Sequence, residues 1–184
     1  DLERRLDKIL RDIEEAARDN IRRNEELLKR SEENVRRNLE ENKKKLEEIK
    51  REVEELERRV KDKDLLKEIR DVLERIRRVV ERALKEIKDL LRRSEELVRK
   101  SIEDIRRVLE RIRRVVKDVK ERIRSEELAK RAEERLRELL KELHEISKKM
   151  LREIKRVNDE INKVSKESLD ELDELVKEIK ERTR

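Results

Sequence analysis

Residues 72–80 read VLERIRRVV, and the same nine residues recur at 108–116. Their apolar side chains fall at i, i+1, i+4, i+7 and i+8, a spacing that puts them on one face of an α-helix. Around this segment the apolar stripe advances by two steps of seven residues and one of four, which gives an 18-residue repeat. Eighteen residues fill about five turns at 3.6 residues per turn, the period of a helix without supercoiling. We therefore expect long, nearly straight helices.

The composition of the chain favours helix and excludes several classes of site. Of 184 residues, 59% are charged and 33% hydrophobic, and Gly, Pro, Cys and aromatic residues are absent. Without them the chain has no disulfide, no thiolate nucleophile, no glycine-rich phosphate loop and no aromatic platform for stacking bases. The net charge is only +6, and Leu, Ile and Val are too abundant for a disordered chain. Leu, Glu, Lys and Arg, the common residues, all favour helix.

The apolar stripe changes phase twice, once near residues 61–64 and once near residues 124–125. Asp62 or Asp64, and Ser125, are suited to cap the helices that follow these breaks. Short connections make consecutive helices antiparallel neighbours. We therefore predict an all-α fold, an elongated up-down-up three-helix bundle that forms a single domain over 1–184. The predicted helices cover about 2–61, 64–124 and 126–182.

A second division of the chain gives six shorter helices. The sequence Arg-Ser-Glu-Glu begins at Arg30, Arg93 and Arg124, and Asn158-Asp159-Glu160 resembles it. With Asp62, these signals recur about every 31 residues and could mark helix starts. A loop normally shifts the helical phase, however, and the stripe passes Ser31, Ser94 and Asn158 unshifted. This continuity favours three helices.

Eleven polar residues occupy the buried phase of the stripe. Aligning the three helices antiparallel brings many of them into common layers: Ser31 with Ser94 and Asn158, Asn24 with Ser101 near Met150, and Asn38 and Asn42 with Ser165 and Ser168. The full set, here called the polar core positions, is Asn20, Asn24, Ser31, Asn38, Asn42, Ser94, Ser101, Ser147, Asn158, Ser165 and Ser168.

The polar core positions have three possible explanations. Buried hydrogen bonds between them would contribute little net stability but would fix the helix register, because a shift of one turn would leave polar groups against Leu or Ile. Alternatively, these residues lie at the margin of the stripe and contact water. A polar ligand cavity is a third explanation. We favour buried networks that set the register.

The 18-residue repeat, the surface rich in Glu, Lys and Arg, and the Asn and Ser layers resemble those of de novo designed helical bundles. The similarity is greatest to parametrically designed, untwisted three-helix bundles with buried hydrogen-bond networks. This resemblance covers the whole chain and implies a stable scaffold with no natural biochemical activity and no cofactor. One departure is the lack of glycine at either loop, where such designs often use it. We expect a thermal midpoint above about 90 °C.

Catalytic and metal-binding patterns are weak. His144 is the single histidine, and Leu140 and Lys141 stand where the Glu-x-x-His pattern of bundle metal sites requires a carboxylate. Adjacent carboxylates such as Glu14 and Glu15 are common in a sequence with 51 Asp and Glu residues, and they lie outside the apolar phase that would adapt them to acid catalysis. We therefore expect no enzyme activity, no metal and no catalytic residue.

The expected partners follow from charge and amphipathicity. The positive excess lies in residues 61–120, where interspersed acids weaken any attraction to nucleic acid. The helices lack aromatic membrane anchors, and no apolar run is long enough to span a bilayer. We expect a monomer that binds neither specific nucleic acid nor membrane. A homo-oligomer is the alternative, as part of a designed self-assembling or partner-binding module. The sequence does not assign a cellular compartment.

Overall fold

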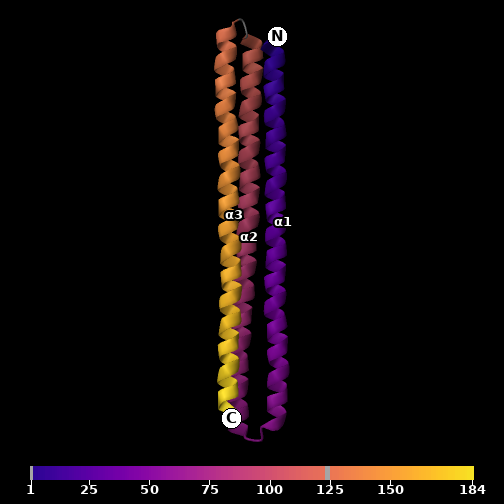
Figure 1. The fold of residues 1–184 in the computed structure, drawn as a ribbon, viewed down its shortest axis with the longest axis vertical. Helices are drawn as coiled ribbons and strands as arrows, with labels where there is room; N and C mark the ends of the chain where they lie inside the picture. Colours follow the sequence, from indigo (N-terminus) through magenta and orange to yellow (C-terminus); the bar gives the residue numbers. More distant parts are fainter. Residues whose placement is uncertain (1, 123–124) are drawn as a thin grey trace. The chain divides into compact units, whose positions relative to one another are not determined.

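The computed structural model describes residues 2–122 and 125–184, and these residues form three α-helices (Figure 1). Helix α1 spans Leu2–Arg59, α2 spans Lys63–Arg122 and α3 spans Glu126–Arg182. This confirms the prediction of an all-α, three-helix bundle.

The helix ends lie close to those predicted. Helix α1 ends at Arg59, two residues before the predicted end at 61, and α2 begins at Lys63, one residue before the predicted start at 64. The predicted end of the second helix at 124 lies outside the described residues. Neither cis peptide bonds nor positive φ angles occur among the described residues. The connection at residues 60–62 therefore turns without any residue in the left-handed backbone conformation.

The alternative of six shorter helices is wrong. Ser31, Ser94 and Asn158 all lie inside continuous helix. At each of these positions the Ser or Asn is flanked by helix-forming residues, and the apolar stripe keeps its phase, so packing and propensity both favour continuation. The Ser-Glu-Glu pattern at Ser31 and at Ser94 therefore does not begin a new helix.

Two of the predicted N-caps are present. Asp62 accepts a hydrogen bond at Oδ1 from the backbone N–H of Asp64, with a donor–acceptor distance of 3.0 Å. Ser125 accepts one at Oγ from the backbone N–H of Leu128 at 3.4 Å. Each bond satisfies an N–H that has no partner within the first turn of its helix. The breaks in the apolar stripe therefore coincide with capped helix starts.

The chain packs into two compact units, each built from a segment of all three helices. Unit 1 comprises Asp1–Arg30 and Ser94–Lys155, and unit 2 comprises Ser31–Arg93 and Arg156–Arg184. Both boundaries on α1 and α2 fall beside polar core positions, at Ser31 and Ser94.

Unit 1 has antiparallel α1 and α2 segments. Asn24 contacts Ser101, and Glu14 contacts Arg113, so positions that increase along α1 meet positions that decrease along α2. The main apolar cluster of this unit contains Leu6, Ile13, Ala17, Ile105, Val108, Ile112, Val116, Ala132, Leu136, Leu139 and Leu143. A second cluster forms around Val98, Met150 and Ile154.

In unit 2 the three helix segments alternate in direction along the chain. Positions on α1 and α3 increase together from the contact of Asn38 with Asn162 to that of Lys45 with Asp173, so these segments are parallel. The segments of α2 and α3 are antiparallel, as shown by the paired ions described below. The apolar cluster of unit 2 contains Ile49, Val53, Ile69, Val72, Ile76, Val80, Leu172, Leu175 and Ile179.

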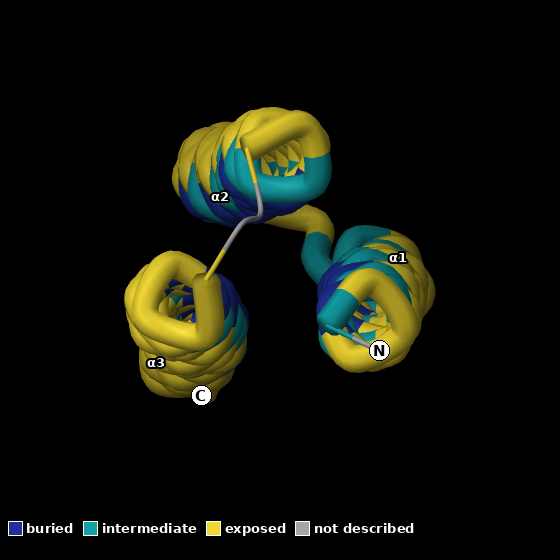
Figure 2. Tube along the Cα trace, turned by 90° about the horizontal axis from the view of Figure 1, so that it is seen from above, coloured by how far each residue is buried: buried dark blue, intermediate teal, exposed yellow. Residues whose placement is uncertain are grey.

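The two copies of VLERIRRVV have the same pattern of burial although they lie in different units. In residues 72–80 and in residues 108–116, the first, fifth and ninth residues are buried and the second and eighth are half-buried. Figure 2 shows the general result, because on each helix the buried positions face the other helices and the exposed positions lie outward. The 18-residue apolar repeat thus selects the face that packs.

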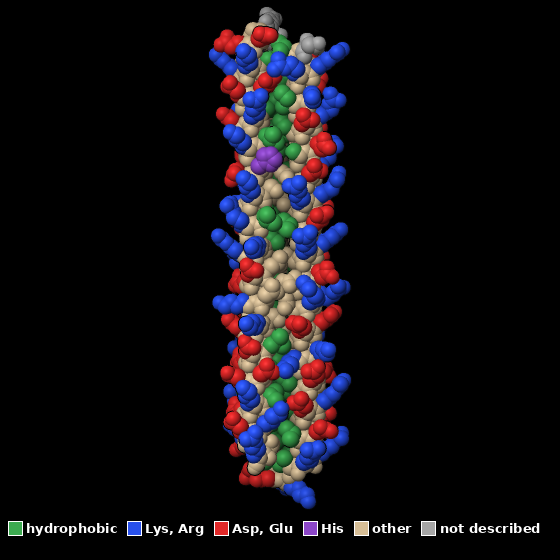
Figure 3. Space-filling view, in the orientation of Figure 1, with side chains coloured by type: hydrophobic (Ala, Val, Ile, Leu, Met, Phe, Trp, Pro, Cys, Tyr) green, Lys and Arg blue, Asp and Glu red, His purple; other side chains and the backbone are tan. Residues whose placement is uncertain are grey.

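Charged side chains cover the exposed faces of the helices. The face drawn in Figure 3 carries interspersed Lys, Arg, Asp and Glu side chains, with apolar groups visible between the helices. Only two large apolar residues are exposed among the described residues, namely Leu128 at 41% and Leu151 at 54%. Both belong to the α3 segment of unit 1.

Candidate functional site

Most of the polar core positions are buried. Three of them, Asn38, Ser147 and Asn158, are half-buried. The buried ones are Asn20, Asn24, Ser31, Asn42, Ser94, Ser101, Ser165 and Ser168.

In unit 1 the polar core positions form a direct bond between α1 and α2. The Nδ2 group of Asn24 donates to Ser101 Oγ at 2.8 Å, and both side chains are buried. These are the two residues that the antiparallel alignment of the sequence pairs. The Oδ1 atom of Asn24 and the Nδ2 atom of Asn20 are buried and have no hydrogen-bond partner among the described residues. Unit 1 therefore satisfies its buried amides only in part.

In unit 2 the polar core positions form a longer network between α1 and α3. The Nδ2 group of Asn42 donates to Ser165 Oγ and to the backbone carbonyl of Asn38, both at 2.9 Å. Asn38 Nδ2 donates in turn to Asn162 Oδ1 at 3.0 Å. The bonded residues on α1 and α3 are 123 and 124 positions apart, close to the offset of about 126 that the sequence alignment implies. This network links the buried interior to the exposed surface at Asn162.

Two members of this network were missed in the sequence analysis. Asn34 accepts from Asn38 Nδ2 at Oδ1 at 3.2 Å and at its backbone carbonyl at 2.9 Å. Asn162 is exposed and lies at the edge of the apolar stripe. Asn34 precedes Asn38 by four residues, a separation that places two side chains on the same side of a helix. That spacing could have identified Asn34, whereas an exposed Asn162 has no comparable signal.

Several other polar core positions have buried polar atoms without a hydrogen-bond partner among the described residues. The hydroxyl oxygens of Ser31 and Ser94 are buried without a partner among the described residues, as is Oδ1 of Asn158. The same holds for Ser168 Oγ. A buried polar group without a partner costs about 1–3 kcal/mol. These groups therefore add no hydrogen-bond stabilisation between the described residues.

The hydroxyl groups that do have partners are not activated for catalysis. Ser101 and Ser165 each accept a hydrogen bond from a neutral Asn amide. A serine nucleophile needs a neighbouring base that can take its proton, and an amide group cannot act as that base. The chemistry available at these positions is hydrogen bonding between helices.

His144 is exposed on α3, as expected for a residue at the edge of the apolar stripe. It lines a cavity of about 470 Å³ in unit 1, together with Asn20 and Ser147. Over the described part of the chain, no group of three or more His, Cys, Asp or Glu side chains is arranged to hold a metal ion.

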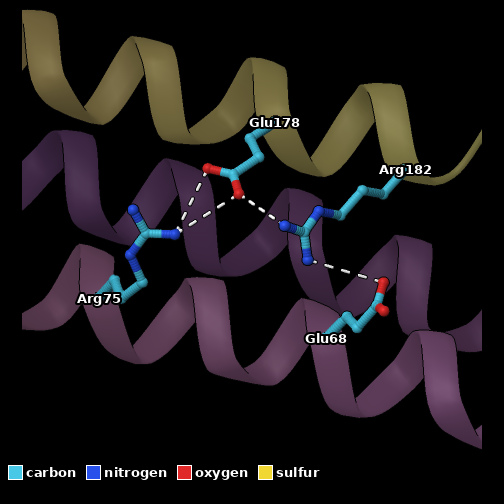
Figure 4. Close-up of polar contacts among 4 residues, drawn as sticks. All are labelled: Glu68, Arg75, Glu178 and Arg182. Carbon is cyan, nitrogen blue, oxygen red and sulfur yellow. Dashed lines mark hydrogen bonds and ion pairs between the residues drawn. The ribbon is translucent and has the colours of Figure 1, made fainter.

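Ion pairs link the outer faces of neighbouring helices. In unit 2, Arg75 of α2 contacts Glu178 of α3 at 3.5 Å, and Glu178 accepts a second bond from Arg182 at 2.8 Å (Figure 4). Arg182 also lies 3.6 Å from Glu68 of α2. Pairs this exposed contribute only about 0–1 kcal/mol each.

Another ion pair in unit 2 shifts the pKa of a lysine. Lys45 Nζ of α1 lies 2.8 Å from Asp173 Oδ1 of α3. The hydrogen bond to Asp173 raises the pKa of Lys45 above its ordinary value of 10.5. Burial opposes this shift in part, and the charges of Asp173, Glu48 and Glu52 add smaller increases. The Lys45–Asp173 pair lies on the same two helices as the Asn and Ser network.

No model of a known protein family matches the chain, and comparisons with curated proteins and with solved structures find no significant similarity. Over residues 2–122 and 125–184, no helix has an 18-residue stretch apolar enough to cross a membrane.

Proposed function

We propose that the chain is a designed structural scaffold whose function is to hold its helices in one register. The observation that carries this proposal is the pair of buried interhelical bonds, Asn24 to Ser101 in unit 1 and Asn42 to Ser165 in unit 2. Each joins two different helices through groups that have no activated nucleophile or metal ligand beside them. Shifting either helix by one turn would break these bonds and bury both partners against apolar side chains.

A designed origin is supported by the sequence itself. The nine-residue segment that recurs after 36 positions, the absence of Gly, Pro and aromatic residues, and the 59% of charged residues are together typical of parametric design. The lack of any significant similarity to known families is compatible with this origin. We propose that the chain has no catalytic activity, and the neutral amide partners of Ser101 and Ser165 support this.

The test replaces both bonded pairs by apolar residues, as Asn24→Leu with Ser101→Ala and Asn42→Leu with Ser165→Ala. The described residues contain no free cysteine, so spin labels can be attached through Arg37→Cys and Lys166→Cys on α1 and α3. We expect one label-to-label distance in the parent protein. In the apolar variant we expect a second population displaced by one helical turn, about 5.4 Å.

The matched control keeps all polar residues and changes two apolar ones, as Val35→Ile with Ile161→Val. It should retain one distance, because these substitutions nearly conserve volume and leave the bonds intact. A single, unchanged distance in the apolar variant would show that the polar residues do not set the register.

Self-association is the second candidate function, and the exposure of Leu128 and Leu151 favours it. If these side chains form an interface, Leu128→Glu with Leu151→Glu should abolish assembly, because it would bury two new charges there. Sedimentation equilibrium decides between the two functions. A 22.7 kDa species at all concentrations supports the monomeric scaffold. A larger species that is present in the parent protein and absent in the double variant supports the assembly module.

A further inference from the structure

A groove between α1 and α3 of unit 1 has features that the register function does not explain. Two adjoining cavities form it, of about 470 and 330 Å³, and both are lined by Arg23, Ser147 and Lys148. We call this feature the α1/α3 groove. Its cavities fall within the range of about 300–1,000 Å³ that small-molecule sites occupy.

The floor of the groove contains a buried donor with no partner. Asn20 is only 4% exposed and lines the larger cavity. Its Nδ2 group makes no hydrogen bond to any described residue. Because an unpaired buried N–H is costly, an acceptor atom delivered by a ligand would remove a penalty that the protein already carries.

The rim of the larger cavity is cationic. Arg23, Lys141 and Lys148 line it against a single carboxylate, Glu145. Glu145 lies 4.0 Å from Lys148, while no ion pair engages Arg23 or Lys141 among the described residues. The rim therefore favours a negatively charged group that also accepts hydrogen bonds, such as a carboxylate or sulfonate.

The smaller cavity adds apolar side chains to the groove, beside Glu26 and Arg30 in its lining. Leu27 and Leu151 line it, and Leu151 is 54% exposed, the more exposed of the two large apolar side chains that lie open to solvent in the described chain. An apolar group placed over Leu151 would remove this surface from water, which is favourable in proportion to the area covered.

We propose that the α1/α3 groove is a binding site for a small amphiphilic anion. Its acidic group lies at Asn20 between the cations of the rim, and its apolar body lies over Leu27 and Leu151. The site needs no metal and no covalent step.

The first test titrates the full chain with 8-anilino-1-naphthalenesulfonate, whose fluorescence rises in an apolar site, and with the neutral N-phenyl-1-naphthylamine. We expect saturable binding of one sulfonate per chain and weaker binding of the neutral compound. Arg23→Glu should weaken sulfonate binding about tenfold. The matched control is Lys29→Glu, which makes the same charge change on an exposed position of α1 that lines neither cavity, and it should stay within about twofold of the parent.

A second pair of variants tests the apolar end of the site. Leu151→Glu should weaken the sulfonate about tenfold or more, whereas Leu128→Glu, the other exposed leucine of α3, should leave it unchanged. Equal affinities of Leu151→Glu and Leu128→Glu, or a lack of saturable binding to the parent protein, would overturn the proposal.

A second measurement follows the Asn20 amide directly. Its side-chain NH₂ signals in a nitrogen–proton correlation spectrum are assigned by their loss in Asn20→Leu, a variant that circular dichroism should show to be fully helical. We expect these signals to shift on titration with the sulfonate, while those of Asn42 in unit 2 do not. Signals of Asn20 that stay fixed at saturation would contradict the proposed site.

Discussion

The two units carry the same kinds of polar residues in the same helical phase, yet they satisfy them differently. In unit 2, Asn42 Nδ2 donates twice, to Ser165 Oγ and to the carbonyl of Asn38, while Asn42 Oδ1 is buried without a partner among the described residues, as is Oδ1 of Asn24 in unit 1. In unit 1, Asn24 makes one bond, to Ser101, and the amide nitrogen of Asn20 makes none among the described residues. Burial is therefore set by position in the stripe, whereas hydrogen bonding depends on what stands across the interface.

The apolar clusters of the two units also differ, in the size of the side chains that form them. The cluster of unit 2 consists only of Ile, Val and Leu, whereas the main cluster of unit 1 includes Ala17 and Ala132. Alanine removes less apolar surface from water than larger side chains do. Unit 1 also holds both exposed leucines, Leu128 and Leu151. Unit 2 nevertheless has cavities of about 360 and 330 Å³ at its own surface, so the units differ in which side chains fill their cores and not in the presence of cavities.

The largest expected effect comes from truncating the same residue in the two copies of VLERIRRVV. Ile76 in unit 2 and Ile112 in unit 1 are both 0% exposed. Ile76→Ala and Ile112→Ala should each lower the free energy of unfolding by about 2–5 kcal/mol, because each leaves a cavity in an apolar cluster. Chemical denaturation measures the total loss, and amide hydrogen exchange locates it.

Amide hydrogen exchange of the same two variants also tests whether the two units open separately. We expect Ile76→Ala to reduce protection mainly in unit 2 and Ile112→Ala mainly in unit 1, since local opening follows compact sets of contacts. Equal loss of protection in both units from either variant would contradict this and show one cooperative structure.

The next effect compares two buried asparagines of α1. Asn42→Ala should cost about 1–3 kcal/mol, because it removes two hydrogen bonds and leaves Ser165 Oγ without its donor. Asn20→Ala should leave stability unchanged or raise it by up to about 1 kcal/mol, because it removes a buried donor whose lack of a partner already costs free energy. Thermal and urea unfolding of both variants measure the difference.

A double-mutant cycle isolates the bond in unit 2. Adding Ser165→Ala to Asn42→Ala should cost less than Ser165→Ala alone, with a coupling energy of about 0.5–1.5 kcal/mol. Strict additivity, or equal losses for Asn20→Ala and Asn42→Ala, would refute the distinction between a bonded and an unbonded amide.

Much of the fold follows from periodicity. The apolar stripe predicted three helices, the continuity through Ser31 and Ser94, and the capping roles of Asp62 and Ser125, because helix ends and faces depend on local sequence. The pairing of Asn24 with Ser101 followed from counting residues back from a short connection. These features require only the helical repeat and the position of the breaks.

The hydrogen bonds themselves were less predictable. Asn38 and Asn42 were placed beside Ser165 and Ser168, but Ser168 Oγ has no partner among the described residues, and the exposed Asn162 takes part instead. Which acceptor an amide reaches depends on side-chain rotamers and on fractions of a turn in register, and a residue count does not resolve them. The α1/α3 groove is likewise not predictable from a residue count, because its shape depends on the rotamers of the side chains that line it.

The helix caps provide a smaller test of the same comparison. Asp62 caps the start of α2 in unit 2, and Asp62→Ala should lower the free energy of unfolding by about 1 kcal/mol. Ser125→Ala, at the start of α3 in unit 1, should cost less, because its capping bond of 3.4 Å is longer than the 3.0 Å bond of Asp62. Thermal unfolding measures both. A greater loss from Ser125→Ala would reverse this order and indicate that the unit 1 end limits stability.

The smallest expected effect concerns the Lys45–Asp173 pair of unit 2. Lys45→Met should lower stability by less than about 1 kcal/mol at pH 8, because the pair is partly exposed. The pKa of Lys45 is raised in the folded protein, so the charged lysine stabilises the fold at pH values below its ordinary 10.5 and this contribution is lost as pH rises through the folded-state pKa.

The difference between parent and Lys45→Met should therefore shrink above pH 10.5. The matched variant Lys44→Met, at an exposed neighbour on α1, controls for the loss of one lysine charge. Urea unfolding across this range measures the difference. A difference that stays constant at high pH would mean that the Lys45 side chain acts through packing of its methylene groups instead of its charge.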